Sequence, residues 1–273
     1  MESKIANALE LTYGPVSVIL TEEKPDKAIS FTKGRWGCVM FMFANAAKGK
    51  TAVFDKETYG CWGGGVGLGF GNAYEHFPGG EACFTHFLSS GNHAWEKGRA
   101  VASALEGKAG KEFTENFLQG EAYVKTPQLV ERFLKELPIM DHGSRYVVFK
   151  PLSETDPAIE KIKTVVMVAN PDQISALVIL ANYARGGMEN VIVPWAAGCQ
   201  TIGIIPFKEN EGKRPRAVLG LTDISARKYV RPLIGSDGFT FAMPYSLFLE
   251  MEESVEESFL NRHTWRSILK EKI

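Results

Sequence analysis

The chain has 273 residues, and 31 basic residues against 32 acidic ones give it a formal net charge of −1. This balance provides no overall attraction for a polyanion, so we predict no nucleic-acid partner. The longest apolar run, residues 38–44, is far shorter than the ~20 residues that cross a bilayer, and residues 1–11 lack the pattern of an export signal. We therefore expect a cytoplasmic protein without a membrane-spanning helix.

The first part of the chain alternates helical and extended patterns. Apolar residues at helical spacing, followed by Gly14 and Pro15, predict an amphipathic helix over residues 2–12. Residues 38–47 are apolar nearly all round and stop at Gly49, which is typical of a buried helix. Short apolar runs at 16–20 and 51–54 predict strands.

Residues 60–71, GCWGGGVGLGFG, contain seven glycines. Each glycine in a regular element costs about 0.5–1 kcal/mol, so this segment predicts a loop whose backbone approaches something closely. It is neither a Walker loop nor a good dinucleotide-binding fingerprint. A flavin or another planar ligand beside Trp62 and Phe70 is one interpretation, and a purely structural loop is the other.

The alternation continues to the C-terminus. Thr126 followed by Pro127, and Asn170 followed by Pro171, predict two helix starts. The pattern predicts an α/β (or α+β) fold with mixed sheets flanked by helices and no repeats. We predict a single domain, 1–273, with any internal seam near residue 151. The remaining predicted elements are helices over 80–88, 95–105, 111–118, 126–137, 170–185 and 245–260, and strands over 146–150, 164–169, 191–194, 217–221 and 239–244.

Four cysteines are the most informative residues. Their spacings match neither the ferredoxin run nor paired zinc knuckles, and without an export signal they do not indicate disulfides. Three of them follow a glycine, where flexible backbone can fold around a cluster and point N–H groups at sulfur. The alternative is that they pack as small buried hydrophobes. These cysteines are Cys38, Cys61, Cys83 and Cys199.

Other candidate groups are weaker. The spacing of His76, His86 and His93 does not place them on one turn of a helix. No nucleophile elbow or zinc-protease helix motif is present. A basic cluster in the second half is typical of a solvated surface, although the segment 225–227 could meet an anion. This cluster contains Arg214, Arg216, Arg227, Lys228 and Arg231.

Several short motifs together resemble the family called domain of unknown function 169, over nearly the whole chain. They are Pro15–Val18, the helix beginning at Cys38, Tyr59–Cys61, Val168–Gln173, Gly198-Cys199 and Met243–Tyr245. The family, from archaea and bacteria that are often anaerobic, has no established reaction. The resemblance implies a cysteine pattern consistent with a bound iron–sulfur centre. One departure is that Leu221 follows Leu219-Gly220 where the family commonly has a cysteine.

That departure leaves the fourth ligand open. Either Cys83 supplies it, or Cys38, Cys61 and Cys199 leave one iron open. We expect a four-iron, four-sulfide (4Fe-4S) cluster on all four cysteines, because the predicted helix start near residue 80 favours a Cys83 thiolate. Residues expected to line the cluster are Gly60, Trp62, Gly63, Gly64 and Gly198.

The expected role is redox chemistry or electron transfer. The expected binding partner is a redox protein or a small molecule. A homo-oligomer is one of the assembly states that we consider. The sequence does not decide whether the protein is an enzyme. Alternatives are a small-ligand or flavin module with packing cysteines, a zinc protein, since four thiolates also suit zinc, and a scaffold without a ligand.

Overall fold

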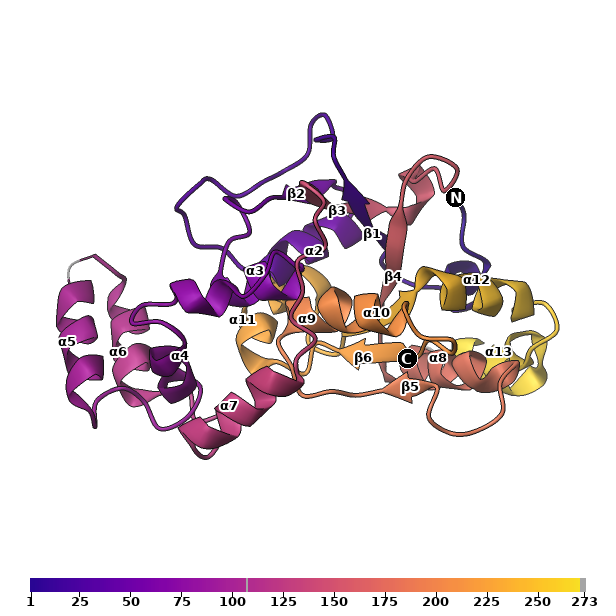
Figure 1. The fold of residues 1–273 in the computed structure, drawn as a ribbon. Coiled ribbons are helices and arrows are strands. Elements are labelled where there is room, and N and C mark those ends of the chain that lie inside the picture. Colours follow the sequence, from indigo (N-terminus) through magenta and orange to yellow (C-terminus); the bar gives the residue numbers. More distant parts are fainter. Residues whose placement is uncertain (107, 271–273) are drawn as a thin grey trace. The chain divides into compact units, whose positions relative to one another are not determined.

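The computed structural model describes residues 1–106 and 108–270, which form two compact units (Figure 1). Within the described residues, unit 1 comprises residues 1–70 and 140–270, and unit 2 comprises residues 71–106 and 108–139. The seam expected near residue 151 is misplaced, because Pro151 ends a strand inside the sheet of unit 1. The chain divides instead at residues 70/71 and 139/140, because unit 2 is inserted between the two parts of unit 1.

Unit 1 is built on one open, seven-stranded sheet with the order β2-β3-β1-β4-β7-β6-β5. Neighbouring strands are antiparallel except β5 and β6, which are parallel, so the predicted mixed sheet flanked by helices is confirmed. The strands are β1 (Val16–Thr21), β2 (Ala52–Phe54), β3 (Tyr146–Pro151), β4 (Ile162–Ala169), β5 (Val191–Ile192), β6 (Ala217–Gly220) and β7 (Phe239–Pro244).

One face of this sheet carries the main apolar core. Alternate strand residues such as Ile19, Val148, Val165 and Phe241 are buried there with apolar residues of the covering helices. A capping box between Asn170 and Gln173 fixes the start of the longest of these helices. The covering elements are α1 (Lys4–Ala8), α8 (Pro171–Tyr183), α12 (Tyr245–Ser254), η3 (Phe259–Asn261) and α13 (His263–Lys270).

The opposite face is covered by helices that also build the candidate site. Phe149 points to this side and meets Phe43 of α2 edge to face, with ring centroids 6.1 Å apart. On this side α3 packs against α9, and α11 packs against α2. These elements are α2 (Val39–Ala47), α3 (Trp62–Gly67), α9 (Gly198–Ile202), α10 (Ile204–Glu209) and α11 (Ile224–Ile234). The short helix η2 (Leu152–Glu154) follows β3.

Unit 2 is entirely helical within its described residues, 71–106 and 108–139. Its aromatic core centres on Phe77, Phe84 and Phe117, and Thr126 caps the last helix by accepting the N–H of Leu129. No helix among the described residues of the whole chain is long and apolar enough to cross a membrane. The elements are η1 (Ala73–His76), α4 (Glu81–Phe87), α5 (Glu96–Leu105), α6 (Lys111–Gln119) and α7 (Pro127–Glu136).

The predicted glycine-rich loop is wrong in its centre. Residues Trp62–Gly67, WGGGVG, form the helix α3, with Cys61 as its N-cap. The low helix propensity of glycine is outweighed by close packing of α3 against α9, which a side chain at Gly67 would prevent. Helices α9, α10, α11 and α13 were also not predicted.

Candidate functional site: a cluster of three thiols

Three of the four cysteines come together in unit 1. Cys38 precedes α2, Cys61 precedes α3, and Cys199 is the second residue of α9. The Cys38 thiol raises the pKa of Cys61, and both of these thiols raise the pKa of Cys199. The three side chains therefore lie within electrostatic range of one another, although the first and the last are 161 positions apart in the sequence. We call them the three-thiol cluster.

Cys61 is held by the first turn of α3. Its Sγ accepts a hydrogen bond from the backbone N–H of Gly64, with 3.3 Å between N and S. Burial, followed by the neighbouring Cys38, raises the pKa of Cys61 to about 12, while the N–H groups of Gly64 and Gly63 act in the opposite direction. Without a cation, this thiol is protonated at neutral pH.

Cys199 also lies against the first turn of α3. Its Sγ donates to the carbonyl oxygen of Gly63 at 3.0 Å, and only 5% of the residue is exposed. Burial, and then the other two thiols, raise the pKa of Cys199 well above the usual value. The backbone at Gly63 and Gly64 thus contacts two of the three sulfurs, in the place where the sequence predicted these glycines to line a cofactor.

The glycines of α3 allow this approach. A Cβ atom on Gly67 would lie 2.8 Å from both the Sγ and the carbonyl carbon of Cys199. A Cβ atom on Gly203, between α9 and α10, would lie 2.0 Å from the carbonyl oxygen of Gly67. Because real side chains cannot make such contacts, α3 and α9 can pack backbone to backbone only with glycine at these positions.

Cys38 completes the cluster at the start of α2. It is half-buried, and burial raises the pKa of its thiol, whereas the backbone N–H groups of Phe41 and Met40 lower it. A Cβ atom on Gly60 would lie 2.4 Å from the carbonyl oxygen of Gly37, so the two segments that lead to Cys38 and Cys61 touch at these glycines. Cys38 is the N-cap of α2, but its sulfur accepts no hydrogen bond from the first turn, in contrast to Cys61 at the start of α3.

Gly198 brings three helix starts together. A Cβ atom on it would lie 2.9 Å from Cγ of Met40 on α2 and 3.3 Å from Cβ of Ala226 on α11. Trp62 is the first residue of α3 and is partly exposed. All five glycine and tryptophan positions predicted to surround a cofactor thus lie next to a cluster cysteine in the chain or in space.

Asp223 is the acidic member of the site, and the sequence analysis missed it. It is the N-cap of α11, where its Oδ1 accepts the N–H groups of Ser225 and Ala226 at 2.9 and 3.2 Å. Its Oδ2 accepts the N–H of Gly198 at 3.2 Å. The Asp223 carboxylate raises the pKa of each of the three cluster thiols. An Asp two residues after the predicted strand 217–221, followed by Ile-Ser-Ala, was a usable N-cap signal.

Cys83 belongs to unit 2, whereas the three-thiol cluster is built from unit 1. It is fully buried in α4, and a Cβ atom on Gly79 would lie 2.3 Å from its Sγ. The helix start was expected to favour a thiolate here. The direction is the opposite, because burial raises the pKa of Cys83 by more than the positive charge of Lys97 lowers it.

Three of the other predicted candidates contact groups of the protein itself. His86 stacks on Trp95 with ring centroids 4.7 Å apart, and Nδ1 of His93 lies 3.0 Å from the carbonyl oxygen of Leu118. Arg227 donates to the carbonyl oxygens of Leu221 and Gly238 at 3.1 and 3.0 Å, so it binds backbone rather than an anion. Over residues 1–106 and 108–270, no three or more His, Cys, Asp or Glu side chains are arranged to hold a metal ion.

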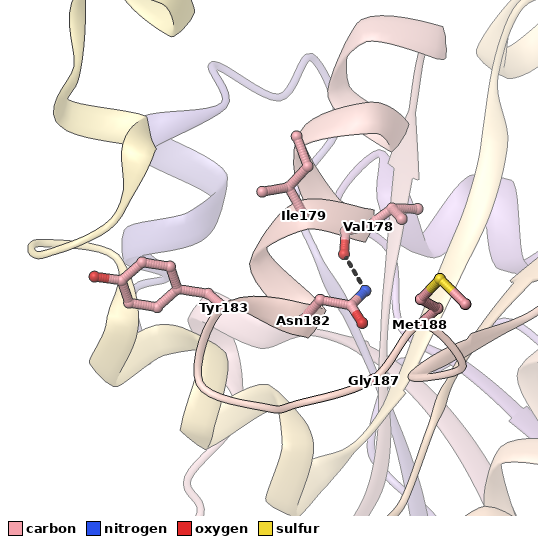
Figure 2. A pocket seen from close by; sticks show the side chains of 6 residues that line it. All are labelled: Val178, Ile179, Asn182, Tyr183, Gly187 and Met188. Carbon is pink, nitrogen blue, oxygen red and sulfur yellow. Dashed lines mark hydrogen bonds between the residues drawn. The ribbon is translucent and has the colours of Figure 1, made fainter.

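A shallow depression of about 430 Å³ lies at the end of α8 (Figure 2). The side-chain amide of Asn182 donates to the carbonyl oxygen of Val178 (Figure 2) and accepts a hydrogen bond from the side-chain amide of Asn190. Both polar atoms of the Asn182 side chain therefore bind protein groups. None of the four cysteines lines this depression, and the three-thiol cluster remains the better candidate site. The lining residues are Val178, Ile179, Asn182, Tyr183, Gly187 and Met188.

Comparison with known proteins agrees with the sequence motifs. The family model of DUF169, described as uncharacterised ArCR, matches residues 4–254. The chain belongs to the DUF169 family. No curated protein and no solved structure matches it. The resemblance drawn from the motifs is therefore confirmed, and the DUF169 assignment brings no reaction with it.

Proposed function

We propose that this DUF169 protein binds an iron–sulfur cluster through Cys38, Cys61 and Cys199. The observation that carries the proposal is the gathering of one buried thiol, Cys199, and two half-buried thiols, Cys38 and Cys61, in electrostatic range of one carboxylate, Asp223. Burial and mutual repulsion keep such thiols protonated, and a carboxylate beside them disfavours ionisation further. A bound metal reverses this balance, because coordination deprotonates a thiol outright.

The donor set suits a cluster better than a single ion. Zinc draws four ligands to about 2.0–2.3 Å from one point, and no group among the described residues is arranged in that way. In a four-iron cluster each thiolate bonds to a different iron, so the sulfurs lie farther apart while still in electrostatic range. Soft thiolates are also the ligands that these clusters select.

The surrounding backbone supports the same proposal. The N–H groups of Gly63 and Gly64 lie near Cys61, and those of Met40 and Phe41 lie near Cys38. N–H groups directed at sulfur stabilise reduced clusters and tune their potentials. A cluster held in this way suits a redox role with an electron-transfer partner. A flavin against these glycines is less favourable, since Gly64 and Gly67 face protein atoms.

The test is the metal content of the wild-type protein. Protein purified strictly without oxygen, or reconstituted with ferrous iron and sulfide, is expected to be brown and to hold about four irons and about four sulfides per chain. Zinc is measured in the same sample. A colourless protein without iron after reconstitution, or one that holds zinc alone, would refute the proposal.

A further inference from the structure

We infer that the carboxylate of Asp223 is the fourth protein ligand of this cluster and binds the iron that the three cysteines leave. This inference rests on the proposed function. A four-iron cluster has four corners, and the three-thiol cluster supplies ligands for only three of them. The fourth ligand is thus an oxygen donor, in place of the Cys83 thiolate expected from the sequence.

The position of Asp223 is fixed by three backbone hydrogen bonds. Ser225 and Ala226 hold Oδ1 at the start of α11, and Gly198, the residue before Cys199, holds Oδ2 at the start of α9. Ala226 and Met40 both lie against Gly198, which brings the starts of α2, α9 and α11 together. The carboxylate is therefore attached to the backbone next to one cluster cysteine and lies in electrostatic range of the other two.

The carboxylate keeps the capacity to bind a metal. An ionised carboxylate has about four lone-pair positions, and the three N–H groups use three of them. Oδ2 receives only the Gly198 N–H among the described residues, so it can also bond to iron. The hydrogen bonds orient the ligand in the same way as the outer-shell partners of known metal sites.

A carboxylate corner has a chemical consequence. Oxygen is a harder ligand than thiolate and binds iron of these clusters less firmly. The iron at Asp223 is therefore the one that leaves first on oxidation. One electron passes from the cluster to an added oxidant, one ferrous ion is released, and a three-iron cluster stays on the cysteines.

The experiment compares wild type with Asp223→Cys and Asp223→Asn under one equivalent of ferricyanide without oxygen. Wild type is expected to release about one iron of about four and to develop the EPR signal of a three-iron cluster. The Asp223→Cys protein has a thiolate at this corner of the cluster and is expected to release several-fold less iron than wild type. Asp223→Asn keeps an effective N-cap and is expected to hold a three-iron cluster as isolated.

Each outcome decides between the two proposals. A wild-type cluster that keeps all its iron, or an Asp223→Asn protein with a full four-iron cluster as isolated, would overturn the assignment of Asp223 and leave the cluster itself intact. Wild-type protein that binds no iron would overturn the proposed function instead. If Asp223→Cys does not fold, as judged by circular dichroism, the Asp223→Asn result decides alone.

Discussion

Cys199 in unit 1 and Cys83 in unit 2 have much in common. Both are buried, both lie in the first turn of a helix, and each has a glycine against its sulfur, Gly67 or Gly79. They differ in their charged and sulfur-bearing neighbours. Two thiols and a carboxylate shift the pKa of Cys199, whereas among the described residues Lys97 is the one charged group that shifts the pKa of Cys83.

Burial, a nearby glycine and a helix start are common to both cysteines, so these features do not distinguish the proposed metal ligand from the other thiol. What distinguishes the unit 1 site is that several donors, contributed by α2, α3, α9 and α11, gather around one region. Cys83 has the surroundings of a packing residue, the alternative that the sequence left open for all four thiols.

The largest effect is expected from the cluster cysteines. Changing Cys38, Cys61 or Cys199 to Ser should each remove most of the bound iron, because a weaker oxygen ligand replaces a thiolate in a site that already has one carboxylate. Iron and sulfide are counted after anaerobic reconstitution. A serine variant at any of these positions that retains a full four-iron cluster would show that the residue is not a ligand.

The next largest effect is expected at the contact between α3 and α9. Gly67→Ala places a methyl group 2.8 Å from the Cys199 sulfur, so it should destabilise the protein by about 1–3 kcal/mol, as overpacking does, and lower the iron content. The matched control is Gly186→Ala, where a Cβ atom meets nothing within 4 Å. Urea unfolding is the measurement. Equal midpoints for the two variants would contradict backbone-to-backbone packing.

A smaller effect is expected from Arg227, which supports the segments on either side of α11. Besides Leu221 and Gly238, its guanidinium donates to the carbonyl oxygen of Ser236. Removing these charged donors in Arg227→Ala should destabilise unit 1 by about 1–3 kcal/mol. Arg231→Ala, at an exposed position of the same helix, is the control. Melting temperatures of both variants are measured by calorimetry, with and without phosphate. Variants that melt like wild type would contradict the structural role of Arg227. A rise in melting temperature with phosphate that only wild type shows would indicate that Arg227 binds an anion instead.

The smallest effect is a pH dependence from His142. Burial is the main cause that lowers the pKa of this histidine, and its Nδ1 accepts the N–H of Ser144 at 3.0 Å. Because the folded pKa lies below the unfolded value of about 6.5, the stabilisation is complete above that pH and is lost as the pH falls through the folded pKa. Urea midpoints measured from pH 7 to pH 5 should fall more steeply for wild type than for His142→Asn. Parallel curves would assign the pH dependence to other groups.

Much of the fold was predictable because its signals are local. The strands of unit 1 and helices such as α7 and α8 follow apolar periodicity, and Thr126 and Asn170 mark two helix starts. The glycine helix α3 was not predictable in this way, because the reason for its glycines is a contact with α9, more than 130 residues further along the chain.

The candidate site was predictable in part. The cysteine and glycine pattern led to the residues around the three-thiol cluster, since thiols and flexible backbone are what the proposed iron–sulfur site requires. The sequence contains no distances, so it grouped Cys83 with the other thiols and assigned Asp223 no role. Asp223 becomes notable only when the folded chain brings the start of α11 to Gly198 and the three thiols.

The most direct test of the difference between the two cysteine environments is the iron and sulfide content of Cys83→Ala beside wild type, both purified and reconstituted without oxygen. The three thiols and Asp223 of unit 1 are proposed to hold the cluster, so Cys83→Ala should retain about four irons per chain and the wild-type visible spectrum. Its stability should fall by no more than the ordinary effect of a small cavity. Loss of iron from a folded Cys83→Ala protein would contradict the account and make Cys83 a ligand.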